Sequence, residues 1–196
     1  KIVEMWQKRL HRKEFEKVKD DTLRGYLQTF FPYQVYQQAE GLVRGTWRGY
    51  RDVAQDAMGL SYFNPAGAKQ LIRKLISKQY KNGRCPRQWN TEGGGNDERD
   101  FHDLPLWVPL AVAKYIENSG DLTIFDEKAR WLDDESVASL AEHLDAGMRY
   151  VLVYGPNELL EIGAGDWNDA LSGLGLKGES LWLNQFAYYA LAKMKR

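Results

Sequence analysis

The stretch Phe101-His102-Asp103-Leu104-Pro105-Leu106-Trp107-Val108-Pro109-Leu110 sets a carboxylate among aromatic and apolar residues, where a helix begins. Asp is a favoured N-cap residue, and Pro105 is tolerated in a first helical turn. Capping alone would therefore explain Asp103, but it does not explain why Phe101 and Trp107 flank it. Aromatic rings form platforms for the faces of sugar rings as readily as they pack in a core. We interpret Asp103 as an acid held in a pocket, and His102 as a hydrogen-bonded loop residue.

Around this segment, apolar residues recur at three- and four-residue steps, and strand-like alternation is nearly absent. The pattern predicts an all-α chain. Asn64 and Pro65 are typical of a helix start, and Gly83 and Gly120 fall where helices are expected to end. Such a series of helices and Gly-rich loops can stack as a bundle, a solenoid or a barrel of helical hairpins. The helices are predicted over residues 29–43, 51–61, 65–80, 104–118, 136–153 and 179–195.

Composition limits the partners of the chain. Its 196 residues, 43% of them hydrophobic, can bury one sizeable core, so we expect one domain. The 27 basic and 27 acidic residues cancel, which argues against nucleic acid as a partner. A single cysteine, Cys85, and the lack of metal-ligand spacing of Cys and His favour a reducing compartment and no structural metal.

The apolar runs also bear on location. No run approaches the roughly 20 residues of a transmembrane helix, and the first residues lack the apolar stretch of a signal peptide. We therefore expect a soluble, cytoplasmic protein with no membrane partner. The sequence opens without Met and stops within a predicted helix, so we expect it to be an internal part of a longer chain.

Three loops carry aromatic, carboxylate and arginine side chains together, and loops of this kind commonly hold a site. In the first, residues 48–56, Arg51 and Gln55 lie one helical turn apart, as do Asp52 and Asp56. For this loop alone, a solvated helix face closed by an Arg–Asp pair is the favoured alternative.

The second loop, residues 89–103, contains three consecutive glycines, which permit close approach to a ligand but are equally typical of a flexible surface loop. The third, residues 161–169, ends in Asp166-Trp167-Asn168-Asp169, for which an Asx-turn tied down by a buried Trp is an equal alternative. Together the loops combine acids and amides that bind hydroxyls, aromatic platforms, and arginines able to hold a carboxylate or phosphate. This inventory predicts a carbohydrate site.

At these loops the sequence resembles glycoside hydrolase family 94, the inverting disaccharide phosphorylases of the cellobiose, cellodextrin and chitobiose type. The resemblance extends from about Leu27 to Leu191, and its motifs occur in the family's order. They are Phe30-Phe31-Pro32-Tyr33-Gln34, Gly49 to Asp56, Asp103 to Pro109, Ala164 to Ala170, and Gly178-Glu179-Ser180-Leu181-Trp182-Leu183.

The resemblance implies an (α/α)6 barrel, of which residues 1–196 would form part as a single catalytic domain. It implies that Asp103 is the general acid, with Phe101 placed over the sugar ring and Asp52 holding hydroxyls of the sugar in the donor subsite. Trp167 and Asp169 match further positions of that subsite. From the same motifs we count Arg51 and Asp166 as substrate-binding candidates, and Arg44 and Arg48 as candidates for holding phosphate or a distal sugar.

The implied chemistry needs one catalytic carboxyl, because phosphate itself attacks the anomeric carbon. Asp103 must then be protonated near neutrality, so its pKa would have to rise through the apolar surroundings of Phe101, Leu104 and Trp107 and through the nearby phosphate anion. The resemblance implies inorganic phosphate as a co-substrate and no other cofactor. It also implies a homodimer, since members of the family are commonly dimeric. Leu104 replaces the second aspartate of the family's pair, so we expect substrate specificity to differ here.

Two alternatives remain from other classes. One is a related (α/α)6 glycoside hydrolase or a barrel associated with a glucan synthase, distinguished by whether product formation needs inorganic phosphate. The other is a non-catalytic carbohydrate-binding fragment, which would bind sugar without turnover.

Overall fold

The computed structural model describes residues 1–40, 45–170 and 174–195, which are mostly helical with a few short strands. The all-α prediction is therefore confirmed, and the architecture is consistent with part of an (α/α)6 barrel. The α-helices are α1 (Ile2–Leu10), α2 (Asp21–Gln28), α3 (Phe30–Ala39), α4 (Tyr50–Phe63), α5 (Pro65–Ile76), α6 (Leu104–Ser119), α7 (Leu140–Val151) and α8 (Leu181–Met194). Two 3-10 helices, η1 (Lys13–Lys17) and η2 (Leu122–Asp126), and five strands complete the described elements.

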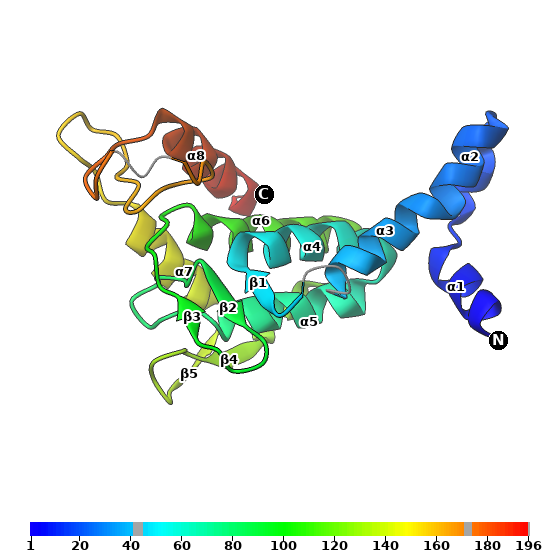
Figure 1. The fold of residues 1–196 in the computed structure, drawn as a ribbon, viewed down its shortest axis with the longest axis horizontal. Coiled ribbons are helices and arrows are strands. Elements are labelled where there is room, and N and C mark those ends of the chain that lie inside the picture. The colour runs from blue at the N-terminus through cyan, green and yellow to red at the C-terminus, as the bar shows by residue number, and fades with distance from the viewer. Residues whose placement is uncertain (41–44, 171–173, 196) are drawn as a thin grey trace.

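Helix α6 is the centre of the fold, since it packs against α4, α5, α7 and α8 (Figure 1). Every residue from Leu104 to Val112 is buried, as expected of a helix that is hydrophobic all round. One side of α6 joins the larger core with α4 and α5. The other side, which includes Leu106 and Leu110, packs against Leu183 and Ala187 of α8. The position of Asp103 is therefore fixed by a helix held on all sides.

The strands form two small antiparallel sheets that the sequence pattern did not predict. Strands β1 (Trp47–Gly49), β2 (Gln88–Asn90) and β3 (Asn96–Asp97) form one sheet, and β4 (Lys128–Arg130) and β5 (Val137–Ser139) form the other. With two or three residues each, they are too short for a visible alternation. The three glycines, residues 93–95, lie in the β2–β3 connection, where Gly93 and Gly95 have φ of +89° and +86°. Their conformational freedom serves a hairpin turn.

Helix boundaries are set by local capping. Asn64 accepts a hydrogen bond from the Gly67 N–H at 3.0 Å, and Gly120 ends α6 with φ of +69°, so both predictions are confirmed. The prediction for Gly83 is wrong, because α5 ends at Ile76. A Cβ on Gly83 would lie 2.1 Å from the Ala146 carbonyl oxygen, so this glycine permits a close approach to α7.

The predicted helix over residues 136–153 begins too early. Residues 137–139 are strand β5, and Ser139 and Glu142 form a capping box that starts α7 at Leu140. At the other end of the chain, α1 and α2 are helices that the sequence pattern did not predict. Both are amphipathic, but Leu10 is the only buried residue of α1 and α2 has none, so their apolar side chains are largely exposed. Residues 41–43 of the predicted helix 29–43 lie outside the described residues.

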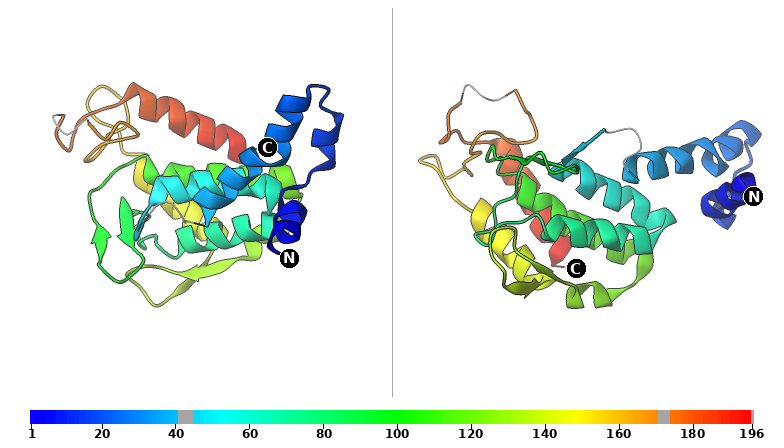
Figure 2. Two further views of the ribbon diagram at one scale, coloured as in Figure 1. Left: turned by 45° about the vertical axis from the view of Figure 1, so that its right-hand side comes forward. Right: turned by 60° about the horizontal axis from the view of Figure 1, so that its bottom comes forward.

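The connection between α7 and α8 lies at the end of the molecule opposite α1 and α2 in every view (Figures 1 and 2). Phe101 forms isolated β-bridges with Gly163 and Gly165, so the segment before α6 is paired with this connection. That pairing brings Asp103 beside Asp166-Trp167-Asn168-Asp169. None of the described helices combines the length and apolarity needed to cross a bilayer.

Candidate active site

The Asp103 carboxylate is fully buried at the N-terminal end of α6, yet it makes no capping hydrogen bond. Its Oδ2 accepts a hydrogen bond from the Trp107 indole Nε1 at 2.9 Å and lies 3.0 Å from Arg51 Nε. Its Oδ1 accepts from Arg51 Nη2 at 3.3 Å. Helix capping, the simplest explanation of an Asp here, is therefore not what this side chain does.

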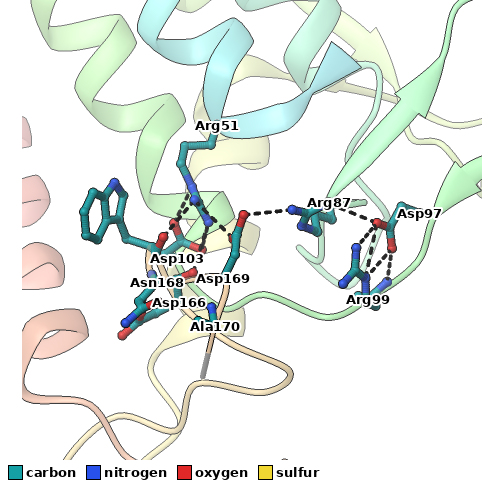
Figure 3. Close-up of polar contacts among 10 residues, drawn as sticks. Arg51, Arg87, Asp97, Arg99, Asp103, Asp166, Asn168, Asp169 and Ala170 are labelled. Carbon is teal, nitrogen blue, oxygen red and sulfur yellow. Dashed lines mark hydrogen bonds and ion pairs between the residues drawn. The ribbon is translucent and has the colours of Figure 1, made fainter. Parts of the chain in front are cut away.

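Arg51, in the first turn of α4, connects three parts of the site (Figure 3). Besides Asp103, its guanidinium donates to the carbonyl oxygens of Asp166 and Trp167, both at 3.1 Å, and lies 3.5 Å from Asp169 Oδ1. Its side chain is only 15% exposed. The alternative of a solvated helix face closed by an Arg–Asp pair is wrong, because the partners of Arg51 come from distant segments.

The loop around Asp166 is held by its own side chains. Asp166 Oδ1 accepts from the Asn168 N–H at 2.9 Å, Asn168 Oδ1 accepts from the Ala170 N–H at 3.1 Å, and Ser180 Oγ donates to Asp166 Oδ2 at 2.6 Å. The Asx-turn interpretation is confirmed, and the Asp166 carboxylate shapes the loop from within. Trp167 is not the buried anchor of that interpretation, since it is 56% exposed.

Asp169 lies between two arginines. Arg51 approaches Oδ1, and Arg87 Nη2 donates to Oδ2 at 2.8 Å (Figure 3). Arg87 also donates to Asp97 Oδ2 at 3.3 Å, and the hydrogen bonds of Arg99 and then Arg87 lower the pKa of Asp97 to about 2. Sequence reasoning missed Arg87, which precedes strand β2 and faces the site from there.

Two cavities adjoin this arrangement and share Asp169. The first, about 100 Å³, is polar and is lined by Arg51 but not by the buried Asp103. The second, about 320 Å³, opens beside Phe101. The first is lined by Gly49, Arg51, Asp52, Arg87, Gln88, Leu104 and Asp169, and the second by Arg99, Phe101, Gly163, Ala164, Asp169, Gly175 and Leu176.

Burial raises the pKa of Asp103 above its ordinary value, since removal from water disfavours the ionised carboxylate. The charge of Arg51 and the Trp107 N–H oppose this effect without cancelling it. The direction is the one expected of a general acid. Trp107 belongs to the predicted apolar surroundings, but its N–H also favours the carboxylate.

The remaining candidates are spread over the site and beyond it. Phe101 is 3% exposed, with the guanidinium carbons of Arg87 and Arg99 lying 5.4 and 5.9 Å from its ring centre. Asp52 is exposed and lines the smaller cavity. Arg48 lines a different cavity, beside Asp56 and Lys74, so the structure does not bring it to Asp103. Arg44 lies outside the described residues.

His102 fixes the segment that carries Asp103. Its Nδ1 lies 2.6 Å from the Glu161 carbonyl oxygen, and its Nε2 lies 3.4 Å from Asp100 Oδ2, to which Tyr150 also donates. Burial lowers the pKa of His102, but the Asp100 carboxylate and Glu161 together oppose burial, and the net direction is upward. This geometry supports the interpretation of His102 as a hydrogen-bonded loop residue.

Gly163 provides a test of how rigidly this segment is held. It has φ of +63°, and an added Cβ would lie 2.3 Å from the Asp100 carbonyl oxygen. Gly163→Ala is expected to lower the free energy of unfolding by about 2–4 kcal/mol, from backbone strain together with overpacking. Chemical denaturation of the variant checks this.

Gly93→Ala is the matched control, since Gly93 has φ of +89° but no atom within 4 Å of an added Cβ. Its free energy of unfolding should fall only by the part due to backbone strain, about 1 kcal/mol. Equal losses of unfolding free energy in the two variants would mean that the backbone at Asp100 shifts at little cost to accept a Cβ at residue 163.

Within residues 1–40, 45–170 and 174–195, no group of three or more His, Cys, Asp and Glu side chains is arranged to hold a metal ion.

Comparison with known proteins identifies the family of the chain. The family model described as the Glycosyl hydrolase 94 superfamily, catalytic domain, matches residues 6–196.

Three curated relatives illustrate the range of the similarity. Solabiose phosphorylase of Paenibacillus borealis is 37% identical over 151 residues, which cover 76% of this chain and 19% of the relative. N,N'-diacetylchitobiose phosphorylase of Vibrio proteolyticus is 27% identical over 172 residues, which cover 74% of this chain and 21% of the relative. Cyclic beta-(1,2)-glucan synthase NdvB of Rhizobium meliloti is 26% identical over 158 residues, which cover 70% of this chain and 6% of the relative. The chain thus spans about a fifth of the length of the two phosphorylases.

Proposed function

Because the chain belongs to the glycosyl hydrolase 94 superfamily, we propose that it forms part of an inverting phosphorylase that cleaves a β-linked gluco-disaccharide or gluco-oligosaccharide. The products are an α-sugar 1-phosphate and the shortened acceptor. One observation carries the proposal. Asp103 is a buried carboxyl with a raised pKa, next to a cavity lined by arginine and aspartate side chains.

The reaction needs one acid and one nucleophile. A phosphate oxygen forms a bond to the anomeric carbon as the glycosidic C–O bond breaks. The bonding electrons leave on the glycosidic oxygen, which takes the proton of Asp103, and attack from the opposite face inverts the configuration. A hydrolase of the inverting type needs a second carboxylate to activate water, whereas phosphate already carries its negative charge.

Arg51 connects phosphate binding to the state of Asp103. Its guanidinium pairs with Asp103 and also lines the smaller cavity. A phosphate anion in that cavity would compete for the guanidinium, since Arg binds phosphate bidentately. Withdrawal of the Arg51 charge, together with the approaching anion, would raise the pKa of Asp103 further and keep the acid protonated.

The sugar would be held by the side chains around the same cavity. Asp52 and Asp169 are exposed acceptors for sugar hydroxyls, and Trp167 offers an exposed ring as a platform. Phe101, at the edge of the larger cavity, would contact the sugar face, and Asp166 would act through the shape of its loop. Arg87 would hold Asp169 in place.

The deciding experiment incubates the complete polypeptide that contains residues 1–196 with β-1,2-, β-1,3- and β-1,4-glucobioses, with and without inorganic phosphate. Formation of α-glucose 1-phosphate from one of them supports the proposal. Free glucose formed equally well without phosphate would point to a hydrolase. Transglycosylation without phosphate would favour a barrel like that of the glucan synthase relative. Sugar binding without any product would leave a carbohydrate-binding segment.

A further inference from the structure

The two oxygens of the buried acid accept hydrogen bonds from different donors. Trp107 Nε1 donates to Asp103 Oδ2 at 2.9 Å, and Arg51 Nη2 donates to Oδ1 at 3.3 Å. Arg51 Nε lies 3.0 Å from Oδ2 as an ion-pair contact and makes no hydrogen bond. If Arg51 leaves, Oδ1 loses its donor while Oδ2 keeps the indole N–H, and the proton of the neutral acid is then directed to Oδ1.

Only one of these donors is committed to Asp103. Arg51 also contacts Asp169 and two loop carbonyls and lines the cavity, so a bound anion competes for it. Trp107 lies one helical turn after Asp103 on α6, and helical side chains lean toward the N-terminus, so the indole lies over the carboxyl. The Trp107 N–H remains on Oδ2 when Arg51 is drawn away.

The Trp107 ring is itself held by α8. Its centre lies 4.7 Å from that of Phe186, and Phe186 stacks on Trp182 with centres 4.8 Å apart and planes at 20°. Trp182 in turn lies 6.2 Å from Trp167, the exposed ring of the proposed sugar platform. The indole is thus restrained by a row of aromatic rings, and its N–H can take few other positions.

We propose that Trp107 is the positioning residue of the general acid: its indole N–H holds Asp103 Oδ2, so that Oδ1 carries the proton and presents it to the leaving oxygen. This inference rests on the proposed phosphorylase function. Trp107 acts through Asp103 and contacts no substrate. The charged and titratable groups that bear on the Asp103 carboxyl are Arg51 from α4, Asp166 from the loop before α8, and Cys85 from the segment before β2.

The test is Trp107→Phe in the complete polypeptide, which keeps an aromatic ring against Phe186 and removes the N–H. Two substrates are compared, the preferred glucobiose and 2,4-dinitrophenyl β-glucoside, each with phosphate. Dinitrophenolate leaves without a proton, so only the glucobiose needs a well-placed acid. We expect kcat/KM for the glucobiose to fall about tenfold or more, and kcat/KM for the aryl glucoside to change by less than about twofold.

The pH profile gives a second readout. The N–H favours the ionised carboxyl, so its loss raises the pKa of Asp103 and moves the alkaline limb of kcat/KM for the glucobiose to higher pH. Trp89→Phe is the matched control. Trp89 is also a buried indole, but its Nε1 has no hydrogen-bond partner among the described residues. The alkaline limb of kcat/KM for the Trp89→Phe variant should stay at the wild-type pH.

The outcomes separate a positioning role of Trp107 from a structural one, and both from failure of the proposed function. If Trp107→Phe lowers kcat/KM equally for both substrates, or for neither, Trp107 is structural and the inference is wrong. If wild type forms no sugar 1-phosphate from either substrate, the proposed function fails and the inference falls with it. Circular dichroism verifies folding. Should Trp107→Phe not fold, Phe186→Leu loosens the indole and keeps its N–H, and it should show the same preferential loss on the glucobiose.

Discussion

Asp103→Asn is expected to abolish phosphorolysis of a glucobiose, with kcat at least about 10²–10⁴-fold below wild type. The amide has the size of the carboxyl but no proton to give to the leaving oxygen. The fold should persist, because an Asn oxygen at the Oδ2 position can still accept from Trp107, and Arg51 keeps its contacts with Asp169 and the Asp166 carbonyl oxygen. Steady-state assay of α-glucose 1-phosphate measures the loss.

The leaving group separates loss of the acid from loss of the site. On 2,4-dinitrophenyl β-glucoside with phosphate, Asp103→Asn should retain most of the wild-type activity, because the glycosidic bond of this substrate breaks without a proton. Asp145→Asn, a matched change at an exposed residue of α7, should behave as wild type on both substrates. Retention of most glucobiose activity by Asp103→Asn would remove Asp103 from the role of general acid.

Features that depend on near neighbours could be predicted from the sequence. Asn64 caps its helix and Gly120 ends its helix because the groups they serve lie within four residues. The Asx-turn at Asp166 has the same local origin. The capping box of Ser139 and Glu142 is equally local, and it sets the start of α7 at Leu140.

Which partner each charged residue takes could not be predicted in this way. Arg51 lies 52 residues from Asp103 and 116 from Trp167, and Arg87 lies 82 from Asp169. These pairs form because α6 packs against α4 and because Phe101 pairs with the α7–α8 connection. The motifs identified the three loops, but packing decides which carboxylate an arginine contacts.

The contact between Asp103 and Trp107 is an intermediate case. A spacing of four residues at a helix start predicts that the two side chains meet, whatever the rest of the fold. The sequence pattern predicts only an apolar contribution from Trp107. Its N–H is the part of the ring that matters to the acid.

Arg51→Met should destabilise the domain by about 3–5 kcal/mol, because it leaves the fully buried Asp103 carboxylate without its counter-charge. It also removes the guanidinium that ties the carbonyls of Asp166 and Trp167 to α4. Thermal unfolding should register this as a lower Tm. Arg149→Met, which breaks an exposed ion pair with Asp145, should change Tm little, because exposed pairs are screened by water.

The pH dependence of this loss follows from Asp103. In the variant the carboxyl keeps the effect of burial and loses the opposing charge of Arg51, so its pKa in the folded state rises further. A folded pKa above the unfolded value means that the folded state binds the proton more tightly, and stability falls as pH rises through that window. The Tm deficit of Arg51→Met relative to wild type should therefore be largest near neutrality and shrink as the pH is lowered.

The double variant Arg51→Met/Asp103→Asn distinguishes an unpaired charge from lost packing. Removing both partners of a buried pair costs much less than removing one, because no uncompensated charge remains. The double variant should therefore be more stable than Arg51→Met alone, and the dependence of its Tm deficit on pH should disappear with the titrating carboxyl. If the two losses simply add and the pH dependence persists, the destabilisation arises from the freed Asp166–Asp169 loop, and the Arg51–Asp103 pair is not what holds the site together.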